Sequence, residues 1–210
     1  MDDFNLTFNY YYTSIGIIGM SRTGKTYLTT KLAATAGKHC SVLVHSPKLK
    51  NTYSKVSNDI KMPAPDQLTA QMVDNFIDLR KDKRYWLLVF DDLDVFVHNS
   101  KESRYLETLP MINKGHWNQG CIWQSRRMVN LPKGIYQNSD YLIFAYGVDP
   151  YDYDDLQKYA GLDIELYKSM PEPVHDPKDP QTVLSAHYLI LDRTSIPYKQ
   201  RIFKHVQGLF

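Results

Sequence analysis

Short apolar runs along the chain alternate with segments whose apolar residues recur at helical spacing. An aromatic and β-branched run over 11–18 predicts a buried strand, and the segment 27–34 predicts a helix that Gly37 closes. Further strands are predicted at 41–45, 85–90, 121–123, 141–145 and 186–191, with 199–206 as a candidate partner of the last. Further helices are predicted at 66–81, within 101–114 and over 152–159. This alternation indicates an α/β fold with a mostly parallel central sheet, helices on both faces and a C-terminal β-hairpin.

Length and charge narrow this picture only slightly. The 210 residues are enough for one domain, 1–210, with a full sheet core. A net charge of +2 does not indicate a nucleic-acid partner by itself, so any DNA contact must come from local patches or from a ring of subunits. Cys40 and Cys121 are expected to be buried as small hydrophobic residues. We expect neither a membrane span nor a signal peptide, because no apolar run has the required length.

A phosphate-binding loop is the clearest chemical signal. Residues 19–26 read Gly-Met-Ser-Arg-Thr-Gly-Lys-Thr, which matches G-x-x-x-x-G-K-[ST], and they lie between a predicted strand and a predicted helix. That arrangement directs backbone N–H groups and a helix N-terminus at an anion. We therefore predict that Lys25 reaches the β- and γ-phosphates of ATP and that the Thr26 hydroxyl holds Mg²⁺. The predicted nucleotide-binding residues are Gly19, Met20, Ser21, Arg22, Thr23, Gly24, Lys25, Thr26 and Tyr27.

The apolar strand 85–90 ends in two acids, which is typical of the second half of such a site. We predict that Asp91 holds Mg²⁺ through water, and that Asp92 orients and activates the attacking water. Asp94 is a third acid nearby, and its simpler interpretation is a helix-capping or solvated residue.

The next predicted strand ends in Gln124, Ser125, Arg126 and Arg127. Gln124 is predicted to sense the γ-phosphate, because its amide can donate a hydrogen bond to a phosphate oxygen or to the lytic water. The arginine pair has three interpretations: a finger that reaches a neighbour's nucleotide, a contact to DNA phosphates, or a solvated loop.

These motifs, with the block from Leu131 through Asp140 to Ile143, resemble the FtsK–HerA superfamily of DNA-pumping ATPases. Within it the chain is most similar to the short genome-packaging ATPases of tailless, internal-membrane double-stranded DNA viruses. The resemblance covers roughly residues 12–146, and the strand near His187 fits the family's late hairpin. It implies a P-loop NTPase fold of the RecA/ASCE type.

The resemblance also implies a mechanism and partners. Such proteins form homo-oligomeric rings, commonly hexamers, with ATP bound between subunits, and they pump double-stranded DNA through a central pore into a preformed capsid. The implied partners are DNA and capsid or inner-membrane virion proteins, and the implied locations are the host cytoplasm and the virion. Lys48, Lys50 and Lys55 are candidates for pore loops, with a solvated loop as the simpler interpretation.

Two departures from the family pattern matter. Many relatives carry Glu where this chain has Asp92, and many carry a trans-acting arginine just before the Gln strand, where residues 113–118 contain none. The trans-acting role is thus open between Arg126, Arg127, Arg104 and Lys114.

Other classes of P-loop protein remain as alternatives. A GTPase is disfavoured, since no Asn-Lys-x-Asp motif is present. A small-molecule kinase, a filamentous-phage-type assembly ATPase and a non-motor nucleotide-switch module stay open.

Overall fold

A computed structural model describes residues 9, 12–46, 53, 56, 60–61, 85–95, 119–128 and 131–206 of the chain. The predicted helices over 66–81 and within 101–114 lie outside these residues, as do Lys48, Lys50, Lys55, Arg104 and Lys114. None of the helices in the described ranges is long and apolar enough to cross a membrane.

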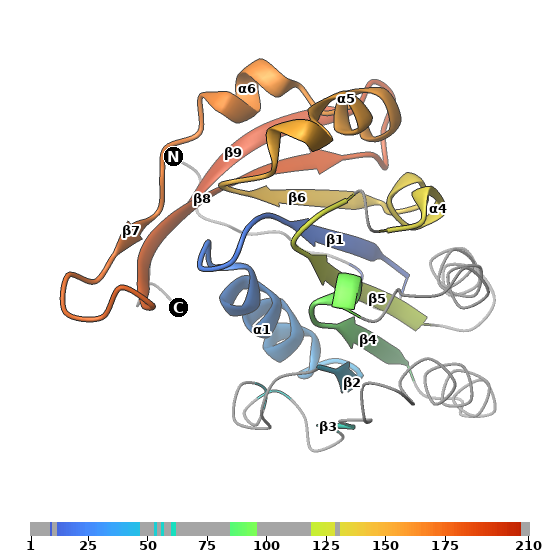
Figure 1. Cartoon of the computed structure of the whole chain (residues 1–210). Coiled ribbons are helices and arrows are strands. Elements are labelled where there is room, and N and C mark those ends of the chain that lie inside the picture. The colour runs from blue at the N-terminus through green and yellow to red at the C-terminus, as the bar shows by residue number, and fades with distance from the viewer. Residues whose placement is uncertain are drawn as a thin grey trace.

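A central sheet organises the described part of the chain (Figure 1). Its strands are β1 (Ser14–Ile18), β2 (Ser41–His45), β3 (Ile60–Lys61), β4 (Trp86–Phe90), β5 (Gln119–Ser125), β6 (Tyr141–Ala145), β7 (Val174–His175), β8 (Val183–Asp192) and β9 (Lys199–Val206). Their order is β3-β2-β4-β5-β1-β6-β8-β7, and β9 pairs with β8. The strands from β3 to β6 pair in parallel, whereas β8 is antiparallel to β6, β7 and β9. The predicted mostly parallel sheet and C-terminal hairpin are therefore confirmed.

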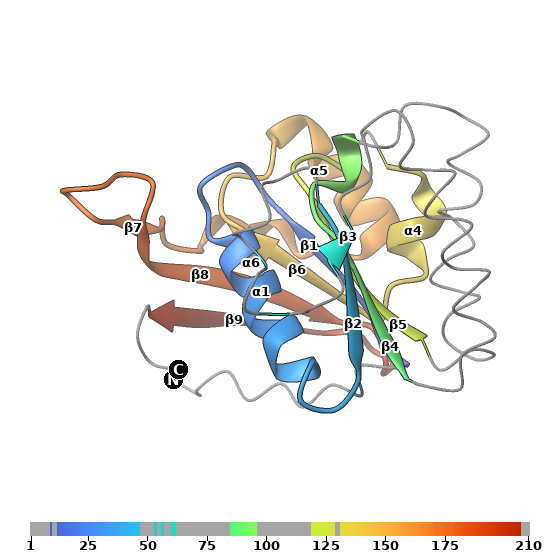
Figure 2. The ribbon, with the colours of Figure 1, turned by 90° about the horizontal axis from the view of Figure 1, so that it is seen from below.

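Helices cover both faces of the sheet (Figures 1 and 2). On one face α1 (Lys25–Ala36) packs Leu28 and Leu32 into a cluster with Ile17 and Val89 of the strands. On the other face lie α4 (Lys133–Gln137), the 3₁₀ helix η3 (Pro150–Asp152), α5 (Tyr153–Asp155), the π-helix η4 (Leu156–Ala160) and α6 (Ile164–Lys168). The strands β1 and β4–β6 are buried along most of their length, which is why β4 and β6 read as continuous apolar runs in the sequence.

The structure differs from the predicted elements mainly in short helices and in a two-residue strand. The predicted acidic helix over 152–159 is present as α5 and η4. The helices α4 and α6 were not predicted, because five residues are too few to show a helical period. The proline-containing stretch 171–181 includes the two-residue strand β7.

The turn after α4 anchors the start of β1. The Asp140 carboxylate accepts a hydrogen bond from the Ser14 backbone N–H at 2.9 Å, and the Asn138 side chain donates to the Gly134 carbonyl at 2.7 Å. Ser139 accepts from the Trp123 indole N–H at 3.0 Å, which links the same turn to β5. The turn at 138–140 therefore positions the strands β1 and β5.

Gly16 allows β5 to pack closely against β1. A Cβ at Gly16 would lie 2.2 Å from Cζ2 of the buried Trp123. Real Cβ contacts are never that short, so any larger residue must displace the indole or shift β1. Because β1 leads into the phosphate loop, this contact also limits where that loop begins.

We expect Gly16→Ala to destabilise the fold by about 1–3 kcal/mol, the usual effect of overpacking a core. The measurement is chemical and thermal unfolding of the variant beside the natural chain. In a Trp123→Phe background the same substitution should cost less, because phenylalanine lacks the atoms that the new methyl group would meet. Strictly additive costs of the two changes would contradict the proposed contact.

Candidate nucleotide-binding site

The loop between β1 and α1 has the backbone geometry of an anion site. Gly24 is the N-cap of α1 and has a left-handed conformation with φ 88°, which glycine adopts without strain. A Cβ at this position would also lie 2.4 Å from the Tyr188 hydroxyl of β8. Glycine is thus required here for both conformation and space. The N-terminus of α1 and its dipole are directed towards the space in front of the loop.

Lys25 and Thr23 are folded onto the loop itself. The Lys25 ammonium donates to the Met20 carbonyl at 2.6 Å, and the Thr23 hydroxyl donates to the same oxygen at 2.8 Å. The first glycine of the motif, Gly19, donates its N–H to the Ser125 carbonyl at the end of β5 at 3.3 Å. A phosphate anion is a stronger partner for an ammonium than a neutral carbonyl is. Lys25 is therefore held close to the position in which it would meet a phosphate.

The strand order brings the other predicted residues to the same edge of the sheet. Strand β5 lies between β1 and β4, and all three run parallel, so the loop after β1, the acids after β4 and the polar end of β5 are neighbours. Asp92 has φ 50°, a left-handed conformation that aspartate tolerates better than most residues. Its side chain is 6% exposed and pairs with the Arg126 guanidinium, with Nη2 and Oδ2 3.4 Å apart.

Asp91 and Asp92 occupy different environments although they are adjacent. Asp91 is fully buried, and its Oδ2 accepts a hydrogen bond from the Ser46 hydroxyl at 2.7 Å. The Tyr53 hydroxyl lies near this carboxylate. Asp92, in contrast, lines the cavity described below. The Ser46 hydroxyl offsets part of the cost of burying Asp91, and the arginine offsets that of Asp92.

Gln124 is buried beside the cavity and does not line it. Its amide oxygen accepts from the Thr29 hydroxyl of α1 at 3.4 Å, and its amide nitrogen donates to the Tyr53 hydroxyl at 3.3 Å. Both functional groups of the predicted γ-phosphate sensor therefore have partners within the chain.

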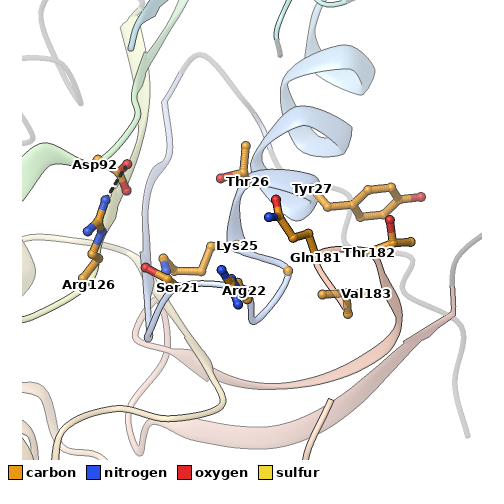
Figure 3. Close-up of a pocket in the computed structure, with 11 residues that line it drawn as sticks. Ser21, Arg22, Lys25, Thr26, Tyr27, Asp92, Arg126, Gln181, Thr182 and Val183 are labelled. Atoms are coloured by element: carbon orange, nitrogen blue, oxygen red, sulfur yellow. Dashed lines mark hydrogen bonds and ion pairs between the residues drawn. The ribbon is translucent and has the colours of Figure 1, made fainter. Parts of the chain in front are cut away.

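A cavity of about 480 Å³ connects these elements (Figure 3). This volume lies within the range of roughly 300–1,000 Å³ that is usual for small-molecule sites. The phosphate loop and α1 contribute Ser21, Arg22, Gly24, Lys25, Thr26 and Tyr27 to its lining. Figure 3 shows Asp92 and Arg126 at one end of the cavity and Gln181, Thr182 and Val183 at the other, with Ser21, Arg22 and Lys25 between them.

The end formed by Gln181, Thr182 and Val183 was missed by the sequence analysis. These residues lie where the loop after β7 enters β8, and Asp179 shapes that loop by accepting from the Thr182 hydroxyl at 2.7 Å and the Gln181 N–H at 3.1 Å. The prolines over 171–181 predict a loop but do not indicate that its end returns to the phosphate site. Tyr53 was missed as well, since nothing in its local sequence marks it as a site residue.

The two arginines after β5 have separate roles in this structure. Arg126 lies in the cavity lining, and its side chain is 49% exposed. Arg127 pairs with Asp149 at 3.0 Å and with Asp152 at 3.7 Å, which ties the end of β5 to the turn η3. Of the candidates for a trans-acting residue that the structure describes, Arg126 therefore is the one at the cavity.

The fold of this chain is similar to that of solved structures of known proteins. No family model and no curated protein sequence matches the chain. Among solved structures, B204, the DNA-packaging ATPase from Sulfolobus Turreted Icosahedral Virus, is similar with a TM-score of 0.71 and 20% identity, over 92% of this chain and 98% of that one. The genome packaging NTPase B204 from Sulfolobus turreted icosahedral virus 2 in complex with AMPPCP is similar with a TM-score of 0.68 and 17% identity, over 91% and 97% of the two chains.

A bacterial protein shares the same fold. EssC (ATPases 2 and 3) from Geobacillus thermodenitrificans matches with a TM-score of 0.58 and 13% identity, over 94% of this chain and 40% of that one. At these identities the comparisons establish the fold. The chain has the fold of the P-loop ATPases, and the structural similarity to viral genome-packaging ATPases that its motifs predicted is confirmed.

Proposed function

We propose that this protein is an ATPase that translocates double-stranded DNA and packages a viral genome into a preformed capsid. One observation carries the proposal: the phosphate loop and the Asp92–Arg126 pair line a single cavity. The cavity lies in a fold that is shared with B204, which is described as a DNA-packaging ATPase. A nucleotide-bound relative, the complex of B204 with AMPPCP, adds support for ATP as the ligand.

The cavity has room and chemistry for ATP in one orientation. The phosphates would lie on the loop, against Lys25 and the N-terminus of α1, with the γ-phosphate towards Asp92 and Arg126. The nucleoside would then extend towards Gln181 and Val183 at the opposite end. The oxygen donors of Thr26 and Asp91 suit Mg²⁺, which would supply charge compensation for the phosphates.

Asp92 is the residue that we assign to the attacking water. It lies at the γ-phosphate end of the cavity, and its carboxylate can accept a proton from the water as the water oxygen attacks the γ-phosphorus. The bond to the leaving β-phosphate oxygen then breaks and gives ADP and phosphate. Lys25 offsets the negative charge of the phosphate oxygens. In a ring, Arg126 would act on the nucleotide of the neighbouring subunit.

The motor would be a homo-oligomeric ring, and the resemblance implies six subunits. It would act in the host cytoplasm on DNA and on capsid or inner-membrane virion proteins, with the virion as a second location. A basic pore does not conflict with a net charge of +2 per subunit, because only the inward-facing loops need to be basic.

We expect Asp92→Asn to bind ATP but to hydrolyse it about 10²–10⁴-fold more slowly, the usual effect of removing a general base. Asp94→Asn is the matched control, because the Asp94 carboxylate accepts a long 3.4 Å bond from the Arg126 backbone N–H and is not among the described residues that line the cavity. Phosphate release and nucleotide affinity should be measured for both. The reverse pattern would assign the water to Asp94.

Arg126→Ala subunits doped into natural rings should reduce activity by more than their fraction, because a trans-acting arginine also disables the neighbour's site. Arg127→Ala is the control, since Arg127 pairs with Asp149 and Asp152 away from the cavity. The measurement is ATP turnover against the fraction of variant. A strictly proportional loss with Arg126→Ala would remove it from this role.

The proposed function as a whole predicts ATP turnover that duplexes of unrelated sequence stimulate. The stimulation should weaken steeply as salt rises, because phosphate contacts release counterions. We would measure ATP turnover with two duplexes at two salt concentrations, together with the mass of the assembly. Lys25→Ala is the inactive control. Turnover by a monomer without stimulation would favour a small-molecule kinase or a nucleotide switch. An oligomer whose ATP turnover does not change with DNA would favour an assembly ATPase of the filamentous-phage type.

A further inference from the structure

A network of buried polar contacts links α1, β5 and the acid at the end of β4. It begins at Thr29 of α1, passes to Gln124 of β5 at 3.4 Å, and continues from Gln124 to the hydroxyl of Tyr53 at 3.3 Å. Tyr53 then contacts the carboxylate of Asp91, which also accepts from Ser46 at 2.7 Å. All five residues are at most 1% exposed. The network therefore connects the phosphate-loop helix, the strand of the predicted sensor and the strand of the predicted magnesium ligand.

The direction of each hydrogen bond follows from the chemistry of the groups. A tyrosine hydroxyl carries its proton at neutral pH. The Asp91 carboxylate lies near this hydroxyl and can only accept, so the proton has an acceptor on that side. The hydroxyl oxygen is then left to accept from the Gln124 amide N–H, so the amide oxygen must face Thr29. One hydroxyl proton thus fixes the orientation of the whole Gln124 amide.

Tyr53 is also held in place by packing. Its ring belongs to the hydrophobic cluster that joins α1 to the sheet, together with Leu28, Val56 and Ile122. A ring that is anchored in this way presents its hydroxyl at a fixed point between the two strands. Within the described residues, Tyr53 is the member of the network that contacts both Gln124 and Asp91.

We infer that Tyr53 is a positioning residue for nucleotide hydrolysis, which ties the amide of Gln124 to the carboxylate of Asp91. The inference rests on the proposed function, since it assigns these two groups to the γ-phosphate and to Mg²⁺. Removal of a side chain that orients a metal ligand in this way typically lowers metal affinity or activity by about 10–100-fold. Tyr53 would make the sensor and the metal ligand respond together, because a rotation of either group changes its contact with the shared hydroxyl.

Tyr53→Phe tests the inference, because it removes the hydroxyl and keeps the ring. We expect turnover to fall about tenfold or more, and the Mg²⁺ concentration that half-maximally enhances ATPγS binding to rise about tenfold. ATPγS affinity in EDTA should change by less than about twofold, since the phosphate loop is untouched. Tyr136→Phe is the matched control, because Tyr136 is a buried tyrosine in the cluster on the opposite face of the sheet.

The Mg²⁺ dependence of binding separates positioning from a structural role. If Tyr53 had only a structural role, Tyr53→Phe would lower the unfolding temperature and the active fraction of the protein. The Mg²⁺ dependence of ATPγS binding would then be the same as in the natural chain, and that result overturns the inference. If Tyr53→Phe does not fold, Gln124→Met breaks the same link from the other side and should shift the Mg²⁺ dependence in the same direction. An unchanged Mg²⁺ dependence in that variant also overturns the inference.

Failure of the proposed function gives a different result. If the natural chain does not turn over ATP under any condition, the ATPase proposal fails, and the equilibrium binding measurements still test Tyr53. If Mg²⁺ does not change the ATPγS affinity of the natural chain, Asp91 is not a metal ligand for Tyr53 to position. That result overturns the inference.

Discussion

The insertion of β5 between β1 and β4 is the constraint on which the site depends. Parallel pairing on both sides fixes the register, with Gln124 beside Ile17 and Trp123 beside Phe90. The polar end of β5 is thereby placed between the phosphate loop and the acids. The close contact of Trp123 with Gly16 sets how near β5 can approach β1. If β1 and β5 packed at another distance or register, the phosphate loop would lie away from the acids after β4 and from Gln124, even with every motif kept.

The second constraint is electrostatic. Two adjacent carboxylates are buried at the end of β4, and an uncompensated buried charge is costly. The fold resolves this by giving each a different kind of partner: hydroxyl groups for Asp91 and a guanidinium for Asp92. Hydroxyl donors hold a carboxylate in place without neutralising it, which suits a metal ligand. A half-exposed arginine can move away, which suits a group that must act on water.

The sequence predicted the parts of the site that carry a local signal. The phosphate loop and the acids after β4 follow from spacing and apolar runs, because backbone geometry in these motifs requires particular residues at particular positions. Tyr53 and Gln181 could not be predicted in this way, because only the packing of distant segments brings them to the site. Gln124 was identified, but its inward orientation depends on Tyr53, and no sequence pattern encodes that partner.

The pairing of Arg126 with Asp92 inside one chain is compatible with a role across a subunit interface. The guanidinium is half exposed and lies 3.4 Å from the carboxylate, and such pairs contribute only about 0–1 kcal/mol. A phosphate group carries more charge and offers bidentate acceptors, so it is a stronger partner for arginine than a single exposed carboxylate is. Exchange of one partner for the other would release Asp92 as the arginine moves. The same side chain could thereby make the acid available only when it has a nucleotide to contact.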